Sequence, residues 1–291
     1  PDINAILWIG HPGNNGIMAL GRILTGEVNP SGRTVGIYPR DFTKDPTYQN
    51  FGNNSQVGGE YYLHIAGEDP LDDPTRVSGN KPVLMYEEGI YLGYRYYETR
   101  GFEEGGTWYD DNVVFPFGYG LSYTSFKWEV ENKTNPANNL TMNGTIEIDV
   151  KVTNTGSVAG KEVVQLYYTA PYTPGEIEKA HVVLGDYVKT KVLEPGKSQI
   201  VRLTLPVQEM ASYDYNDLNN NGHKGYEVDE GTHIVKLMKN SHEVVEAISY
   251  NVPDGGFQYT TSRITGNDIE NRFVGKWDSL PRQDGITMNP V

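Results

Sequence analysis

The chain has 291 residues, a formal net charge of −14 and 37% hydrophobic residues. This length allows two domains of ordinary size, and the 33 Gly, 17 Pro and 21 Tyr indicate a globular, loop-rich chain. The negative charge argues against nucleic acid or an anionic membrane surface as a partner, and no apolar run approaches transmembrane length. Because the chain has no cysteine, disulfides, Cys-ligated zinc and thiol catalysis are excluded, and the redox compartment stays open.

The first 40 residues predict one strand–helix–strand unit. The apolar run 3–9 predicts a buried strand, and a helix follows over about 15–24, with Asn as its N-cap and Gly26 closing its C-terminus. Residues 33–38 predict a second strand. A helix in this crossover position favours a parallel, buried sheet. A chain that begins inside a strand, without Met or a leader, indicates a fragment or one piece of a cut polypeptide.

Residues 41–82 predict a long irregular excursion. They contain the dipeptide Asp-Pro three times, with further Asn and Gly, all of which favour turns. Long ordered loops usually serve a site or an interface, so this one either overlies a site or another domain, or is a solvated insertion. Both interpretations stay open.

The stretch 83–124 combines aromatic side chains and glycines at high density. Two clusters bracket it, YEEGIYLGYRYY at 86–97 and FPFGYGLSYT at 115–124. Glycine permits close backbone approach beneath flat rings, and burying each large aromatic contributes about 3 kcal/mol at most. The stretch therefore predicts a rigid connection, stapled by aromatic side chains against a domain face.

From residue 126 the hydrophobic period changes to two. Residues 145–152 alternate strictly between apolar and polar, which predicts a half-buried strand. Further strands are predicted at 163–168, 200–205 and 233–237, with turns at 154–156, 194–196 and 230–231. Short strands separated by such turns indicate an antiparallel β-sandwich.

The last stretch, 256–291, lies outside this pattern. Asn267 and Asp268 predict the cap of a short helix that contains Ile269, Phe273 and Val274. We expect a tail, or a linker toward a further domain.

Several of these motifs resemble the β-glucosidases of glycoside hydrolase family 3. The two aromatic–glycine clusters resemble the end of that family's α/β domain, and VTNTGSVAGKEVVQLY at 152–167 with LEPG at 193–196 resembles its fibronectin-III-like domain. The resemblance implies an α/β fold followed by an all-β fold. Residues 1–123 would then be the C-terminal part of an α/β sandwich domain, a parallel sheet with helices. Residues 124–255 would form an immunoglobulin- or fibronectin-III-like β-sandwich. A continuing tail over 256–291 is typical of the minority of members with inverted domain order, in which the barrel comes last.

The resemblance further implies a retaining, exo-acting β-glucosidase without a cofactor. Such an enzyme hydrolyses terminal β-D-glucosyl residues of β-glucosides or cello-oligosaccharides, as in cellulose degradation. Its reaction requires two carboxylates, held about 5–5.5 Å apart. In the family the nucleophilic Asp lies on the barrel domain, and an acid/base supplied by the α/β domain lies upstream of the strand that matches 3–9. We therefore expect this chain to be catalytically incomplete, with the remainder of the same polypeptide as its partner.

Two alternatives remain: a β-xyloside substrate, and a non-catalytic carbohydrate-binding or spacer module. If the chain stands alone, the strand predicted at 3–9 exposes an open edge and an apolar face. Self-association stays open, as does the compartment, whether bacterial cytoplasm, periplasm or secreted.

Glu87 and Glu88, beside Tyr86 and Tyr91, are the candidate carboxylates of this chain, with Glu88 the stronger. A Glu among aromatic side chains has the raised pKa of a general acid. The structural alternative, which we favour, is an ion pair with Arg95 or hydrogen bonds that lock the segment.

The glycine-rich turn after the first predicted strand lies at the sheet edge where open α/β folds bind ligands. His11, Asn14 and Asn15 are therefore candidates to border a sugar pocket, with a tight turn and an Asn helix cap as the alternative. Trp108, among glycines and acids, is a candidate for sugar stacking. Four histidines lack metal-ligand spacing and are expected at the surface: His64, His181, His223 and His242.

DLNNNG at 217–222 matches the first half of a calcium loop, with oxygen-bearing side chains at alternate positions before a Gly. The Glu required at the twelfth position is missing, because Val228 stands there and Glu227 is one residue short. In the resembled family this stretch is a variable turn. We therefore expect no metal. The ligands of a calcium ion would be Asp217, Asn219 and Asn221.

Overall fold

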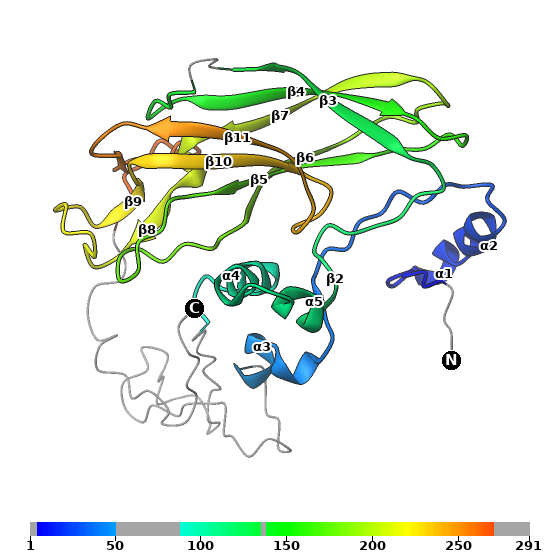
Figure 1. Ribbon diagram of the computed structural model, residues 1–291, viewed down its shortest axis with the longest axis horizontal. Coiled ribbons are helices and arrows are strands. Elements are labelled where there is room, and N and C mark those ends of the chain that lie inside the picture. Colours follow the sequence, from blue (N-terminus) through cyan, green and yellow to red (C-terminus); the bar gives the residue numbers. More distant parts are fainter. Residues whose placement is uncertain (1–4, 51–87, 135–137, 271–291) are drawn as a thin grey trace, which may run out of the picture.

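The computed structural model describes residues 5–50, 88–134 and 138–270. Figure 1 shows a β-sandwich on one side of the molecule and a smaller, mainly helical part on the other. Within the described ranges, no helix has the length and apolar character needed to cross a membrane. The largest cluster of buried apolar side chains lies in the sandwich.

Three antiparallel sheets build the sandwich. The first has the order β3 (Phe126–Lys133), β4 (Thr145–Asn154) and β7 (Ser198–Pro206). The second has the order β11 (Val244–Val252), β10 (Gly231–Met238), β5 (Val163–Thr169) and β6 (Val183–Lys189). The third joins β12 (Phe257–Tyr259), β9 (Gly225–Val228) and β8 (Ser212–Asp214), and a 3-10 helix, η2 (Val207–Met210), precedes it.

The core of the sandwich follows from strand periodicity. Successive side chains of a strand point to opposite faces, so the apolar positions of β4 all face inward; Ile148 and Val150 are fully buried. The pairing of Ile148 with Leu203 of β7 brings a second buried residue to the same face. The next strand, β5, is buried on both faces, because Tyr167 on its outer face packs against the aromatic–glycine stretch.

The helical part consists of short elements. Its helices are α1 (Gly13–Gly16), α2 (Met18–Leu24), η1 (Phe42–Lys44), α3 (Pro46–Asn50), α4 (Tyr94–Glu104) and α5 (Trp108–Asn112). Its strands, β1 (Tyr38–Pro39) and β2 (Val113–Phe115), pair with each other antiparallel. A small core of Tyr97, Tyr109 and Val113 holds α4, α5 and β2 together.

The helix predicted over about 15–24 is confirmed as the pair α1 and α2. Gly26 follows the end of α2 with a φ of +78°, a left-handed conformation that favours glycine, as predicted for the helix C-terminus. The predicted Asn cap is wrong, because the N-cap residue of α1 is Pro12 and no side chain caps the helix.

The strand predicted at 3–9 is wrong in its described part. Residues 5–9 form no strand, and the side chains of Ile6 and Trp8 are each 68% exposed. The strand predicted at 33–38 is reduced to its last residue, in the short β1, and its partner runs antiparallel. A parallel strand is stable only between neighbours that cover it, and none is placed beside 5–9 among the described residues.

The four strands predicted for the sandwich are confirmed, within β4, β5, β7 and β10. The predicted tail at 256–291 contains β12, whose Tyr259 is buried in the sandwich core. The helix predicted after Asn267 does not begin within the described residues, because Asp268 forms an antiparallel bridge with Thr261. Phe273 and Val274 lie outside them, as does most of the predicted excursion 41–82, of which η1 and α3 are described.

Candidate functional site

The aromatic–glycine stretch forms an interface between the helical part and the sandwich. Tyr94, at the start of α4, stacks on Phe117 with ring centres 4.6 Å apart and meets Tyr167 of β5 edge-on at 6.2 Å. The backbone N–H of Leu184 in β6 donates a hydrogen bond to the Tyr94 hydroxyl at 3.0 Å. Stacked and edge-on aromatic pairs contribute beyond their buried area, so these rings fix α4 against the sheet as the sequence predicted.

A buried carboxylate, Glu98 of α4, lies at the centre of this interface. One of its oxygens accepts hydrogen bonds from the hydroxyls of Tyr109, at 2.6 Å, and Ser241, at 2.7 Å. Its other oxygen lies 3.0 Å from Nδ1 of His242, whose ring stacks on Tyr109 at 3.7 Å. The hydrogen bond to Glu98 raises the pKa of His242, and burial raises the pKa of Tyr109. Glu98 therefore joins α4, α5 and the β10–β11 hairpin.

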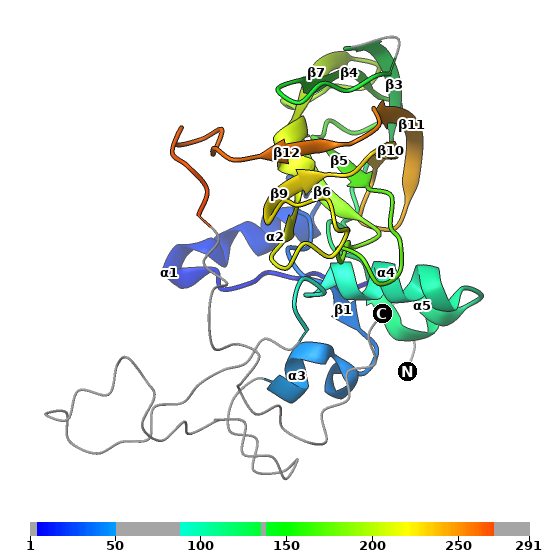
Figure 2. The ribbon, with the colours of Figure 1, turned by 90° about the vertical axis from the view of Figure 1, so that its left-hand side faces the viewer.

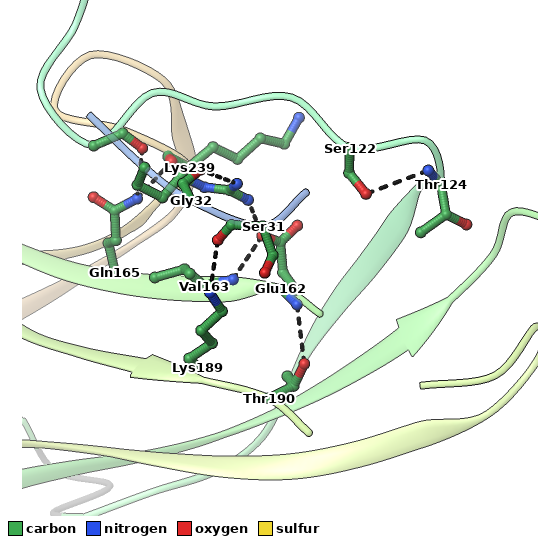
Figure 3. Close-up of polar contacts among 12 residues, drawn as sticks. Ser31, Gly32, Ser122, Thr124, Glu162, Val163, Gln165, Lys189, Thr190 and Lys239 are labelled. Atoms are coloured by element: carbon green, nitrogen blue, oxygen red, sulfur yellow. Dashed lines mark hydrogen bonds and ion pairs between the residues drawn. The ribbon is translucent and has the colours of Figure 1, made fainter. Parts of the chain in front are cut away.

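A second polar cluster joins the N-terminal segment to the start of β5. The guanidinium of Arg33 forms a buried ion pair with Glu162. The same Glu162 oxygen accepts a hydrogen bond from the backbone N–H of Val163 at 2.7 Å, and the Glu162 N–H donates to Thr190 at 2.9 Å (Figure 3). Burial raises the pKa of Glu162, and the positive charge of Arg33 opposes this shift.

At Gly118 the backbone of the aromatic–glycine stretch lies directly against the Gln165 side chain of β5. The side-chain amide of Gln165 donates to the carbonyl of Gly118 at 3.0 Å. It also donates to the carbonyl of Lys239 at 2.7 Å (Figure 3). Gly118 has a φ of +78°, and a Cβ at this position would lie 2.1 Å from the Gln165 amide oxygen. The glycine is therefore required both for its conformation and for its contact with the sandwich.

A groove of about 1750 Å³ lies between α4 and the sandwich, with Glu88 in its wall. Glu88 is 4% exposed. Nearby, the hydroxyl of Tyr91 donates a hydrogen bond to Glu178, and burial raises the Tyr91 pKa. Asp45, also in the wall, accepts from the Thr47 N–H at 2.9 Å. The burial of Glu88 fits a structural or a catalytic role, so its catalytic role and its ion pair with Arg95 both stay predictions; Glu87 lies outside the described residues.

The other predicted substrate residues do not gather in one place. His11 and Asn15 are exposed beside or on α1, and Asn14 lies within α1. Trp108 begins α5, which lies well apart from α1 in both Figure 1 and Figure 2. Its half-buried ring meets Tyr96 edge-on, and the two ring centres are 6.3 Å apart. Trp108 thus packs against α4, and sugar contacts by these four residues stay predictions.

The predicted calcium loop connects β8 to β9. Asp217 accepts a hydrogen bond from the Gly222 N–H at 3.0 Å, and Asn221 donates one to Glu227. Burial raises the pKa of Glu227, against the hydrogen bonds from Asn221 and Asn219. Across the described part of the chain, no three His, Cys, Asp or Glu residues lie together as a metal site.

The polar pairs of the interface, Glu98 with His242 and Arg33 with Glu162, were missed by sequence reasoning. Glu98 lies four residues after Tyr94, so both occupy one face of α4, and this spacing was the available signal. His242 was expected only at the surface; it is half-exposed but contacts a buried carboxylate. No local pattern connects Glu98 to His242, because the two residues lie 144 positions apart.

Comparisons with known proteins match both parts of the chain. Residues 1–94 match the glycosyl hydrolase family 3 C-terminal domain, and residues 162–241 match the fibronectin type III-like domain. β-Glucosidase A of Butyrivibrio fibrisolvens is 36% identical over 223 residues, which are 73% of this chain and 22% of that protein. Thermostable β-glucosidase B of Acetivibrio thermocellus is 32% identical over 230 residues, 78% of this chain and 24% of that protein.

Solved structures agree. A β-glucosidase of Paenibacillus barengoltzii has a TM-score of 0.61 and 35% identity, covering 80% of this chain and 21% of that one. β-Glucosidase 3B of Thermotoga neapolitana, solved with glucose, has a TM-score of 0.60 and 30% identity, covering 82% and 27%. The predicted fold class, an α/β domain followed by a β-sandwich, is thereby confirmed. The chain spans about a fifth of the length of the curated relatives it matches.

Proposed function

Since this chain belongs to glycosyl hydrolase family 3, whose C-terminal domain it joins to a fibronectin type III-like domain, we propose that it serves as a non-catalytic part of a β-glucosidase. The whole enzyme is a retaining exo-glycosidase that removes terminal β-D-glucosyl residues from β-glucosides or cello-oligosaccharides. The nucleophilic Asp and the acid/base lie in the remainder of the same polypeptide, in the barrel domain and the start of the α/β domain. We keep the division into 1–123, 124–255 and 256–291 as part of this proposal.

The observation that carries the proposal is the run of β-glucosidase relatives over 68–84% of the chain. The hydrogen bonding of three buried carboxylates supports a non-catalytic role for this chain. Glu98, Glu162 and Asp214 each accept hydrogen bonds from other groups of this chain. A carboxylate occupied in this way holds the fold rather than transferring a proton to a substrate.

The exposed apolar residues of the N-terminal segment support the proposal that another part of the same polypeptide covers them. Ile6 and Trp8 are each 68% exposed, and Leu24 of α2 is exposed to the same degree. Clustered exposed apolar side chains mark an interaction surface. The start of the α/β domain, with the strands that would pair beside 5–9, is the partner that fits an apolar strand pattern.

The test is hydrolysis of an aryl-β-glucoside by this chain alone and by the full-length protein, with an aryl-β-xyloside in parallel. We expect turnover of the glucoside by the full-length protein and none by this chain. Hydrolysis by this chain alone would refute the assignment of both carboxylates to other segments. Faster turnover of the xyloside than of the glucoside would show that the enzyme is a β-xylosidase. Sugar binding without turnover by either protein would favour a carbohydrate-binding module.

Glu88→Gln in the full-length protein completes this test. Because we assign Glu88 a structural role, turnover should stay within about tenfold of the parent enzyme. A loss of several orders of magnitude in a folded variant would place Glu88 in the reaction.

A further inference from the structure

The hairpin β8–β9 brings a buried carboxylate to the loop that resembles a calcium site. Counted along the chain, Glu227 falls one residue short of the position that closes such a loop. In the structure β9 folds back on β8, so that Glu227 pairs with Ser212 and its side chain points inward, 3% exposed. Its carboxylate contacts the side-chain amide of Asn221. The hairpin register thus supplies the acid that the loop lacks in sequence.

The loop presents three more side-chain oxygens. Asp217 accepts from the N–H of Gly222, Asn219 from that of Asn221 at 3.3 Å, and Asn221 from that of His223 at 2.8 Å. Each of these oxygens keeps a second lone pair, because the structure assigns it one hydrogen bond to the backbone. Asp214 anchors the start of the loop by accepting from the backbone N–H of Leu218 at 2.6 Å.

An independent observation at Glu227 points to a ligand. Its Oε1 is buried and has no hydrogen-bond partner, although the side-chain amides of Asn221 and Asn219 lie against the same carboxylate. No Lys or Arg among the described residues forms an ion pair with Glu227, and Lys179 is paired with Asp229, two residues further along the chain. A buried carboxylate oxygen without a donor or cation is strongly disfavoured, so this atom takes up either a proton or a cation, and the oxygens of the adjacent loop favour a cation.

We propose that the β8–β9 hairpin binds Ca²⁺ through the Glu227 carboxylate and the side-chain oxygens of Asp217, Asn219 and Asn221. All four donors are oxygens, two of them neutral amides, a set that suits Ca²⁺ and not zinc. Mg²⁺ demands a smaller, near-ideal octahedron and keeps its waters, so it fits this mixed set less well. Binding requires the amide nitrogens of Asn221 and Asn219 to release Glu227, so that their oxygens can turn toward the ion. With two carboxylates in the site, the affinity should fall in the weaker range, about 10⁻⁵–10⁻³ M.

The proposed ion has a position from which it can stabilise the fold. Leu218, within the loop, and Tyr226, on β9 after it, line the groove between α4 and the sandwich. Ca²⁺ would therefore rigidify one wall of that groove. This proposal does not depend on β-glucosidase activity, because it concerns the sandwich alone.

The test is a titration of the chelator-treated chain with CaCl₂ or MgCl₂ at constant ionic strength, followed by calorimetry and by thermal unfolding. Because a ligand of the native state stabilises it by mass action, we expect Ca²⁺ to raise Tm by about 5 °C, saturably, and Mg²⁺ to do much less. Glu227→Gln and Asp217→Asn should each weaken the Ca²⁺ response at least tenfold. Glu246→Gln, which removes an exposed carboxylate of β11, is the matched control and should leave the response intact.

Several results would overturn the proposal. An unchanged Tm with no calorimetric signal up to about 10 mM Ca²⁺ would exclude a site of this class. An equal response to Mg²⁺ would reduce it to general charge screening. A Ca²⁺ response that persists in both loop variants would place the ion elsewhere. If Glu227→Gln fails to fold, Asp217→Asn decides alone, because its side-chain oxygen can still accept from Gly222.

Discussion

The β-sandwich and the N-terminal segment contain similar apolar residues but expose them to very different degrees. Leu203 of β7 is fully buried, whereas Leu24 of α2 and Ile6 are each 68% exposed. In the sandwich, each sheet covers the apolar face of another, so the apolar side chains are buried by other residues of this chain. In the N-terminal segment the apolar pattern is equally clear, but the described residues contain no surface that covers it. Under the proposed function, this contrast separates the sandwich, which covers its own apolar faces, from a segment that another part of the polypeptide covers.

The interface between the N-terminal segment and the β-sandwich is buried in the same way as the sandwich core. Arg33 belongs to the N-terminal segment, yet its side chain is only 13% exposed where it meets Glu162. The aromatic–glycine stretch is therefore part of the covered region. Asn29 belongs to the same interface, since its side chain bonds Ala159, Ser122 and Tyr123. The cluster of uncovered apolar side chains therefore lies before it, within 5–24.

The largest effect is expected from Arg33→Met. This change removes the ion-pair partner of the mostly buried Glu162 and should lower the free energy of unfolding by about 3 kcal/mol in urea denaturation. Adding Glu162→Gln should recover part of that loss, because the uncompensated charge is then removed. Arg22→Met is the matched control, since Arg22 pairs with Glu27 on the surface and its loss should cost at most about 0.5 kcal/mol. Equal losses for Arg33→Met and Arg22→Met would mean that the interface does not couple the two regions.

A smaller effect is expected from pH at Glu98 and His242. The hydrogen bond to Glu98 raises the pKa of His242 above its ordinary value of 6.5, and the carboxylate of Asp110 adds to the shift. A raised pKa means that the contact contributes fully below pH 6.5 and is lost as the pH rises through the folded-state value.

The Tm difference between the parent and His242→Gln measures this contribution. It should favour the parent at about pH 5.5 and shrink toward zero by about pH 8. His181, whose pKa burial lowers to about 4, and His233, whose pKa burial also lowers, act in the opposite sense, but they are present in both proteins and cancel. A difference independent of pH would show that His242 contributes by packing on Tyr109 alone.

The same contrast explains what the sequence could predict. Strict alternation identified β4, because a half-buried strand has only one face to cover. The equally apolar run 3–9 led to a wrong prediction of a buried strand, because composition does not reveal whether a partner strand lies beside it. Glu98 and His242 could not be paired, since only the fold brings α4 to the β10–β11 hairpin. Glu227 was dismissed for its spacing, although hairpin register decides where its carboxylate lies.

The most direct measurement of the central claim is hydrogen exchange of this chain and of the full-length protein, followed peptide by peptide. We predict that β4, β5 and β7 are protected equally in both, and that residues 5–24 exchange rapidly in the chain but become protected in the full-length protein. Strong protection of 5–24 in the chain alone, or its absence in both proteins, would contradict the claim that this segment awaits the remainder of the α/β domain.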